Sequence, residues 1–162
     1  MTPDGQPSAT PTVRRVTADD AVPWARLFAG YRSFYELPDD DRAVATTWGW
    51  LVGEQHGMTG LVAVAADGTL LGLANVRTFA RPSTATTGLY LDDLFVDPDA
   101  RRSRAGSALL RAAADVAAQR GAVVVRWITA QDNARARALY DRHATATPWV
   151  TYDMAPGRAD RT

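Results

Sequence analysis

Two neighbouring aspartates stand at the centre of an apolar run that is typical of a β-strand. Asp92 and Asp93 lie in GLYLDDLFV, residues 88–96. Successive side chains of a strand point to opposite faces, so we expect one of the carboxylates to face a ligand and take up a proton there. A buried carboxylate without a partner is costly, and the alternative role is an ion pair with an arginine such as Arg77 or Arg126. That alternative suits Asp93 better than Asp92.

A loop with three arginines follows this strand and precedes a helix expected over residues 107–120. NH groups at the start of a helix lack partners within the helix, and together with the positive end of the helix dipole they favour phosphate binding. Gly106 is the one glycine of the loop, and Arg104 stands where such loops usually carry a second. We expect a negative φ at Arg104 and a guanidinium that hydrogen-bonds a phosphate in two places. A plain helix start with a solvated arginine face is the alternative.

A second helix is expected over residues 133–144, and it carries two further polar candidates. The phenol of Tyr140, with an unperturbed pKa of about 10, is neutral at pH 7 and able to donate a proton. Tyr140 shares a helix face with Ala136 and Leu139, so packing of its ring in the core is the alternative. Asn133 stands near the start of the helix, where it could bind a ligand or act as a cap.

The composition excludes several kinds of site. The chain has 162 residues, of which 46% are apolar, so we expect one domain over residues 13–156 after a disordered tail over residues 1–12. Cysteine is absent, which excludes disulfides, thiolate metal sites and a cysteine nucleophile. His56 and His143 are too far apart in the sequence to suggest a metal site. Neither a membrane span nor a leader segment is recognisable, and we expect a cytoplasmic protein without a membrane partner.

Charge is distributed unevenly along a chain whose formal net charge is zero. Residues 101–142 contain nine Arg and three Asp, so this stretch is positively charged. The rest of the chain carries an equal net negative charge. A basic half beside an acidic half suits a polyanionic cofactor and a cationic substrate better than a nucleic acid, for which a broad basic surface is typical. Chance and solvation of a charged face are the alternative explanation.

Apolar periodicity and turn residues predict a mixed α/β order, with the pattern βααββ followed by βαβαβ. Thr17 and Asp20 cap the first helix, and Asp67-Gly68 marks a hairpin turn. The expected strands are residues 13–17, 60–66, 69–80, 88–96, 123–129 and 148–154, and the expected helices are residues 21–35, 38–51, 107–120 and 133–144.

Four segments, taken in this order and at these separations, resemble the GNAT family of N-acetyltransferases. They are YLDDLFVDP, RRSRAG, VVVRWIT and DNARARALYD. The likeness is specific from about Leu89 to Tyr140, and within the family it is closest to diamine and small-amine acetyltransferases through LDDLFV and LYD. It implies an α/β fold with a mixed, mainly antiparallel central sheet flanked by helices on both faces. It also implies direct transfer of an acetyl group from acetyl-CoA to a primary amine in a ternary complex, without a metal.

The resemblance assigns roles to individual residues. Tyr140 would protonate the departing thiolate of CoA, and Asp92 would take the proton of the amine directly or through water. Asn133 would hydrogen-bond the pantetheine arm, and backbone groups of residues 94–96 would hold that arm as an added strand. Arg101 and Gly106 match the ends of the family's phosphate loop, whose inner glycine is replaced here by Arg104. The residues expected to bind the cofactor are Leu94, Phe95, Val96, Arg101, Arg102, Ser103, Arg104, Ala105, Gly106, Ser107, Asn133 and Tyr140.

The acceptor site is expected beside the two early helices, which frame the acceptor in this family. Tyr31, Tyr35, Glu36 and Asp93 are the expected substrate-binding residues. Glu36 and residues 39–41 would form an acidic lip for a cationic amine, although capping of the second helix is the more frequent use of such acids. The expected acceptor is a small-molecule amine, a polyamine or an amino acid. A homodimer and a protein or peptide acceptor are left open, and a non-catalytic acyl-CoA-binding module is the alternative to an enzyme.

Overall fold

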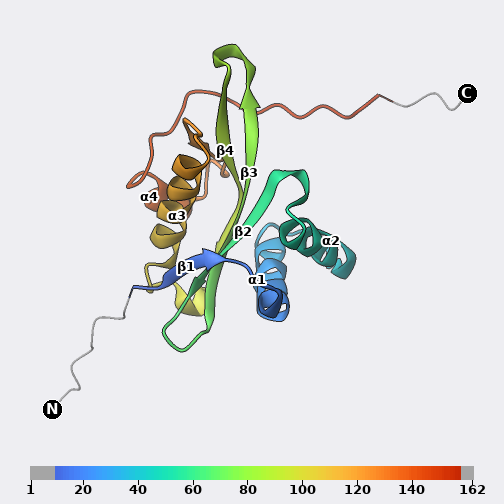
Figure 1. Ribbon diagram of the computed structural model, residues 1–162, viewed down its shortest axis with the longest axis vertical. Helices are drawn as coiled ribbons and strands as arrows, with labels where there is room; N and C mark the ends of the chain where they lie inside the picture. The colour runs from blue at the N-terminus through green and yellow to red at the C-terminus, as the bar shows by residue number, and fades with distance from the viewer. Residues whose placement is uncertain (1–9, 158–162) are drawn as a thin grey trace, which may run out of the picture.

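The computed structural model describes residues 10–157, which form a five-stranded sheet with helices on both faces (Figure 1). The strands are β1 (Thr12–Arg15), β2 (Met58–Val64), β3 (Leu70–Arg81), β4 (Thr86–Val96) and β5 (Val125–Arg126), and the helices are α1 (Ala21–Phe34), α2 (Asp41–Val52), α3 (Ala105–Gln119) and α4 (Ala134–Tyr140). Short 3₁₀ helices are η1 (Ala18–Asp20), η2 (Gln55–Gly57), η3 (Pro82–Thr84) and η4 (Pro98–Ala100). The strands lie in chain order, antiparallel from β1 to β4, with β5 parallel to β4. This confirms the expected fold class.

Local signals account for the early elements. The hairpin between β2 and β3 turns at Gly68, whose φ of +89° costs glycine little, and the Asp67 carboxylate accepts the Thr69 NH at 2.9 Å. The side chain of Asp40 accepts the Ala43 NH at 2.9 Å and so caps α2. At least this member of the acidic group before α2 therefore has the capping role.

Two apolar clusters lie on opposite faces of the sheet. On one face, Trp24, Leu27 and Phe28 of α1 pack with α2 residues and with Leu73 of β3. On the other face, α3 buries Leu109 and its neighbours against the sheet, and Leu139 and Tyr140 of α4 pack beside them. α1 and α2 thus cover one face, and α3 with α4 covers the other. Among the described residues, no helix combines the length and the hydrophobicity that a membrane crossing requires.

The register between β3 and β4 shifts by one residue at the paired aspartates. Val76 pairs with Leu91 and Asn75 pairs with Asp93, so that Asp92 is the extra residue of a β-bulge. Because the bulge adds one residue to β4, the alternation of its side chains is offset by one after Asp92. The face that receives odd-numbered side chains before the bulge receives even-numbered side chains after it.

The carboxyl-terminal part differs most from the sequence-based predictions. The strand expected over residues 123–129 is reduced to β5, and the helix expected over residues 133–144 is assigned only as far as Tyr140. The strand expected over residues 148–154 is wrong for this structure, since within residues 10–157 that stretch pairs with no strand and is exposed. Alternating apolar residues favour a strand, but a strand also needs a neighbouring edge to pair with.

The amino-terminal boundary also differs slightly from its prediction. Residues 1–9 of the expected tail lie outside the described residues. Pro11 is buried and Thr12 already belongs to β1, so the folded part begins before residue 13.

Candidate active site

A cavity of about 430 Å³ opens between β4, the start of α3 and α4, with the end of α1 as one wall. Of the residues expected to bind the cofactor, the ones that line it are Leu94, Phe95, Val96, Arg101, Arg102, Arg104, Ala105, Gly106, Ser107, Asn133 and Tyr140. Ser103 is the exception, and its hydroxyl accepts the Ala105 NH at 3.3 Å instead. Tyr31 and Tyr35 of the expected acceptor site also line the cavity, whereas Glu36 is an exposed residue of the loop after α1.

Five arginines make the lining strongly positive, and no acidic residue is part of it. Three come from the loop before α3, and the other two are Arg135 and Arg142 from α4 and the turn after it. These two arginines were not predicted to bind the cofactor, although the surplus of arginine over residues 101–142 pointed to them. A positive lining at the start of α3 suits a ligand with several phosphate groups.

Arg104 has a left-handed backbone conformation, with φ +64° and ψ 12°, immediately before α3. The expectation of a negative φ is therefore wrong. The Ser103 NH donates to the Ala100 carbonyl at 3.0 Å, and after this turn the chain must reverse to enter the helix. Glycine adopts such a conformation freely, whereas a residue with a Cβ is held there at a cost of roughly 1–3 kcal/mol.

Gly106 allows a close contact between α3 and α4. A Cβ at this position would lie 2.9 Å from Leu139 Cδ2, which is closer than carbon atoms approach. The Ser107 hydroxyl and His143 Nε2, 2.9 Å apart, join the same two segments near the cavity. The single glycine of the loop thus permits helix packing, and its φ is not among the positive ones.

The edge of β4 that faces β5 is open beside the cavity. β5 pairs with β4 only at Leu89 and Tyr90, and β4 continues to Val96. The cavity occupies the gap, with residues 94–96 in its wall. Backbone groups on this edge are available to an extended ligand that lies along the strand.

The two aspartates lie on the same face of the sheet. Arg77 Nε donates to Asp92 Oδ1 at 3.2 Å and lies 3.0 Å from Oδ2, and Asn75 Nδ2 donates to Asp93 Oδ2 at 2.9 Å. Asn75 and Arg77 are two residues apart on β3, so their partners on β4 share one face. Two expectations are therefore wrong: the bulge at Asp92 removes the alternation, and the arginine partner belongs to Asp92 rather than Asp93.

Burial perturbs both carboxylates. It raises the pKa of Asp92, while the Arg77 guanidinium opposes this rise. Burial also raises the pKa of Asp93, against the hydrogen bond from Asn75 and the opposing influence of the Tyr31 hydroxyl. Asn75 Oδ1 is buried and accepts no hydrogen bond from the described residues. This side of the sheet therefore presents polar oxygen atoms with unused acceptor capacity. Asn75 was not predicted, although a polar residue within an apolar strand was a signal for it.

Three tyrosines gather where this polar group meets the cavity. The rings of Tyr31 and Tyr35 are 5.0 Å apart at an angle of 60°, and Tyr140 packs edge-on against Trp127 at 5.2 Å. Burial, with a contribution from Tyr35, raises the pKa of Tyr140 to about 12. Burial and the nearby Asp93 also raise the pKa of Tyr31. Tyr140 therefore packs in the core and presents a neutral phenol to the cavity, and its role as a proton donor stays a prediction.

Asn133 is the N-cap of α4. Its side-chain oxygen accepts the Ala136 NH at 3.2 Å, and the residue also lines the cavity. The capping alternative is confirmed, and contact with the pantetheine arm stays a prediction.

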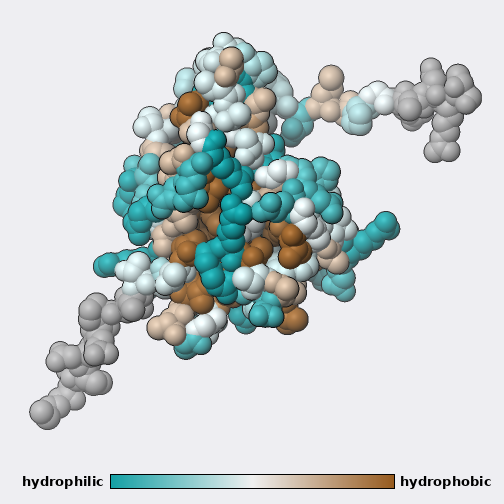
Figure 2. All heavy atoms as spheres, in the orientation of Figure 1, coloured by the Kyte–Doolittle hydropathy of each residue, from teal (hydrophilic) through white to brown (hydrophobic). Residues whose placement is uncertain are grey.

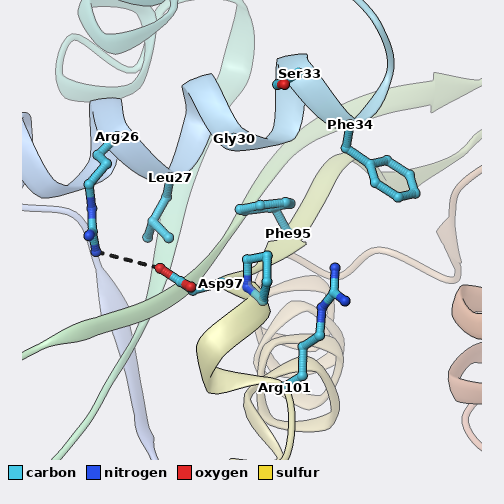
Figure 3. Close-up of a pocket in the computed structure, with 9 residues that line it drawn as sticks. Arg26, Leu27, Gly30, Ser33, Phe34, Phe95, Asp97 and Arg101 are labelled. Atoms are coloured by element: carbon cyan, nitrogen blue, oxygen red, sulfur yellow. Dashed lines mark ion pairs between the residues drawn. The ribbon is translucent and has the colours of Figure 1, made fainter.

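A second cavity, of about 400 Å³, adjoins the first along α1 (Figure 3). Its wall includes Phe95, whose ring lies under Gly30, and the two cavities share Phe34, Phe95 and Arg101. Figure 3 shows the Arg101 side chain extending toward this wall, while Arg26 and Asp97 form an ion pair of 3.5 Å at its edge. Arg101 is thus placed between the two cavities.

Comparison with known proteins agrees with this arrangement. A sequence profile of the acetyltransferase (GNAT) family matches residues 24–144. The chain is 33% identical over 134 residues to an uncharacterized N-acetyltransferase, YhfO of Bacillus subtilis, with coverage of 81% of this chain and 87% of the relative. It is 25% identical over 141 residues to the D-amino-acid N-acetyltransferase HPA3 of Saccharomyces cerevisiae, with coverage of 86% and 88%.

A solved structure, the ribosomal-protein-alanine N-acetyltransferase of Brucella melitensis, is similar with a TM-score of 0.73 and 25% identity over 90% of this chain and 99% of that one. The chain therefore belongs to the GNAT family and is an acetyltransferase. Members of this family use acetyl-CoA as cosubstrate, and the relatives named here include enzymes for amino-acid and for protein acceptors.

Proposed function

We propose that this acetyltransferase transfers the acetyl group of acetyl-CoA to a primary amine of a small molecule, with polyamines and amino acids as the leading acceptors. The observation that carries the proposal is a cavity lined by five arginines and three tyrosines, with Asp92 and Asp93 held on β4 by Arg77 and Asn75. The yeast relative is named a D-amino-acid N-acetyltransferase, and this name supports the amino-acid class of acceptor.

We infer that acetyl-CoA binds in this cavity, with its phosphates at the arginines and its pantetheine arm along β4. Arginines of the loop before α3 and of α4 would bind the phosphates, together with NH groups of the first turn of α3. The pantetheine arm would extend along the open edge of β4 at residues 94–96, where one NH group could polarise the thioester carbonyl. This arrangement directs the thioester toward Tyr140.

During the transfer the ammonium nitrogen loses two protons and the sulfur gains one. The amine nitrogen forms a bond with the thioester carbon, the bond between carbon and sulfur breaks, and CoA leaves as the thiol after Tyr140 donates its proton to sulfur. The second nitrogen proton, released as the amide forms, reprotonates Tyr140. The ammonium proton is first taken up by the carboxylate pair of Asp92 and Asp93. Asp93 is the better placed of the two, because it contacts Tyr31 of the cavity wall, whereas Arg77 occupies Asp92.

The experiment that tests this function measures CoA release from acetyl-CoA over a panel of polyamines, D- and L-amino acids, aminoglycosides and amino-terminal peptides. We expect turnover with one class of small amine. Preference for a peptide would assign the chain to protein acetylation. If none of the acceptors in the panel supports CoA release, the proposal is contradicted.

Tyr140→Phe keeps the ring packing against Trp127 and removes the hydroxyl. We expect acetyl transfer to slow by on the order of 10²-fold with little change in CoA affinity, because only the proton donor is lost. Single-turnover rates and CoA titrations of the variant check this. Full activity in the variant would show that Tyr140 has only a packing role.

A further inference from the structure

One arginine stands beside the paired aspartates and stays accessible. Leu73, Asn75 and Arg77 alternate along β3, so their side chains lie on the face that α1 and α2 cover. Figure 1 shows the hairpin of β3 and β4 extending beyond these helices, and Figure 2 shows pale spheres, of intermediate hydropathy, at its tip. The side chain of Arg77 is 39% exposed and that of its partner Asp92 is 25% exposed. A small molecule can therefore reach this ion pair from the solvent.

The guanidinium of Arg77 is held in place but keeps most of its hydrogen-bond donors. Its Nε contacts the two carboxylate oxygens of Asp92 at 3.2 and 3.0 Å, and its Cζ lies 4.8 Å from the centre of the Tyr90 ring. Within residues 10–157, its two Nη groups donate no hydrogen bond. Such paired donors have the geometry that binds a carboxylate through both oxygens. Arg77 thus has a free end for the carboxylate of a ligand.

The carboxylate of Asp93 lies one step along the same face. Asp93 accepts a hydrogen bond from Asn75, as Asp92 does from Arg77. Asn75 and Arg77 are two residues apart on β3, which corresponds to about 7 Å. An α-amino acid spans about this distance, because two covalent bonds separate its nitrogen from its carboxylate carbon and each hydrogen bond adds about 3 Å. Its ammonium can thus lie at Asp93 while its carboxylate lies at Arg77.

A polyamine fits the same place less well. Its first ammonium group could use Asp93, but the carboxylate of Asp92 is already occupied by Arg77. A second ammonium group near this pair would meet the guanidinium, and like charges at such a distance repel each other. The polar group therefore offers one position for a cation and, next to it, one position for an anion.

We propose that Arg77 binds the carboxylate of the acceptor, so that this enzyme acetylates an amino acid in preference to a polyamine. The inference rests on the proposed transfer of an acetyl group to a primary amine, and it gives Arg77 a role in substrate selection. Asp93, which would hold the ammonium group, lies beside Tyr31 of the cavity wall. A carboxylate bound at Arg77 would therefore direct the amine toward the cavity.

The first test compares acceptors that differ only in the carboxylate. Alanine and phenylalanine, in both D- and L-forms, are each measured beside their amides, and spermidine represents the polyamines. We expect kcat/KM for the best amino acid to exceed that for its amide by about 10-fold to 100-fold, because only the acid accepts two charge-assisted hydrogen bonds from Arg77. This comparison uses the unmodified protein and does not depend on the folding of any variant.

The second test changes the arginine. Arg77→Gln should raise KM for the amino acid by about 10-fold or more and change KM for the amide little, so that the preference for the acid is lost. The double variant Arg77→Gln, Asp92→Asn removes both charges, leaves no unpaired carboxylate and should lose the preference as well. Arg126→Gln is the matched control. Arg126 also lies over an aromatic ring, 5.6 Å from that of Phe79, but within the described residues it pairs with neither aspartate, and its variant should keep the preference.

The outcomes separate this inference from the proposed function. A preference for spermidine or for the amides would overturn the role of Arg77 and leave acetyl transfer to a small amine intact. A preference for the acid that persists in both Arg77 variants would also overturn it. If no acceptor supports CoA release, the proposed function is contradicted and the inference is overturned with it.

Discussion

At the scale of single residues, Arg104 has a backbone conformation that suits glycine better than arginine. We expect Arg104→Gly to raise the free energy of unfolding by about 1 kcal/mol, because φ is +64° at this position and the strain of a Cβ is removed. Urea unfolding of the protein without acetyl-CoA measures the effect.

Arg104→Ala is the matched control, since it removes the guanidinium but keeps the Cβ. This variant should be no more stable than the unmodified chain. If alanine and glycine stabilise the protein equally, charge rather than strain is responsible, and the strain assigned to Arg104 would be wrong. Both variants should bind acetyl-CoA less tightly at low salt, because each removes one of the five arginines of the cavity.

Asp93 combines a functional position with an unfavourable environment. Burial raises its pKa, so Asp93 favours the folded state below the pKa of the unfolded chain, and this contribution is lost as the pH rises through the higher folded-state pKa. We expect Asp93→Asn to be more stable than the unmodified protein at pH 8 by on the order of 1 kcal/mol, or roughly 2–4 °C in Tm.

The stability difference should shrink as the pH falls below about 3.9, the ordinary pKa of aspartate, because Asp93 is then protonated in both states. Thermal unfolding over this pH range checks the sign. The same variant should lose acetyl transfer by at least about 10²-fold if Asp93 takes the amine proton. Asp92→Asn is the comparison. A larger loss of activity in that variant would show that Asp92, and not Asp93, accepts the proton. A stability gain that grows as the pH falls would contradict the assigned direction of the pKa.

At the scale of elements, the approach of α3 to α4 depends on Gly106. Gly106→Ala should displace Leu139 and with it the neighbouring Tyr140, because the new Cβ would lie 2.9 Å from Leu139 Cδ2. We expect weaker CoA binding and slower transfer with little loss of stability, since alanine favours a helix over glycine by about 1 kcal/mol and offsets the strain. Isothermal titration and denaturation separate the two effects.

The double variant Gly106→Ala, Leu139→Ala tests the cause. Removal of the Leu139 side chain makes room for the new Cβ, so the effect of Gly106→Ala on CoA affinity should be smaller in this background. An unchanged effect would show that Gly106 acts through its own backbone and not through α4.

At the scale of the whole molecule, binding of acetyl-CoA should stabilise the fold. Loop, helix and strand meet around the cavity only in the folded state, so acetyl-CoA at about a hundred times its Kd should add about 2.7 kcal/mol. The increase in Tm should decline with added salt, because arginines screened by salt bind phosphate less tightly. An acetylated cysteamine thioester, which has no phosphates, should give little increase, and a Tm unmoved by millimolar acetyl-CoA would contradict the proposed function.

Most of the fold and the outline of the cavity could be predicted from the order and spacing of the residues. Apolar periods, caps and the Asp67-Gly68 turn are local signals, and they predict the elements from β1 to α3 because neighbouring residues decide them. The loop from Arg101 to Ser107 and Tyr140 could be predicted for the same reason, since a helix start and a helix face are defined by sequence spacing.

How these parts face one another depends on contacts between residues far apart in the chain, which local patterns do not specify. The bulge at Asp92 arises from the register of β4 against β3, and it brings both aspartates to one face although local alternation predicts two. The positive φ of Arg104 follows from the direction in which α3 must leave the loop, and Gly106 depends on a residue 33 positions later in the chain, Leu139. Residues 148–154 have the pattern of a strand yet do not form one here, because a strand exists only where a second edge accepts its hydrogen bonds.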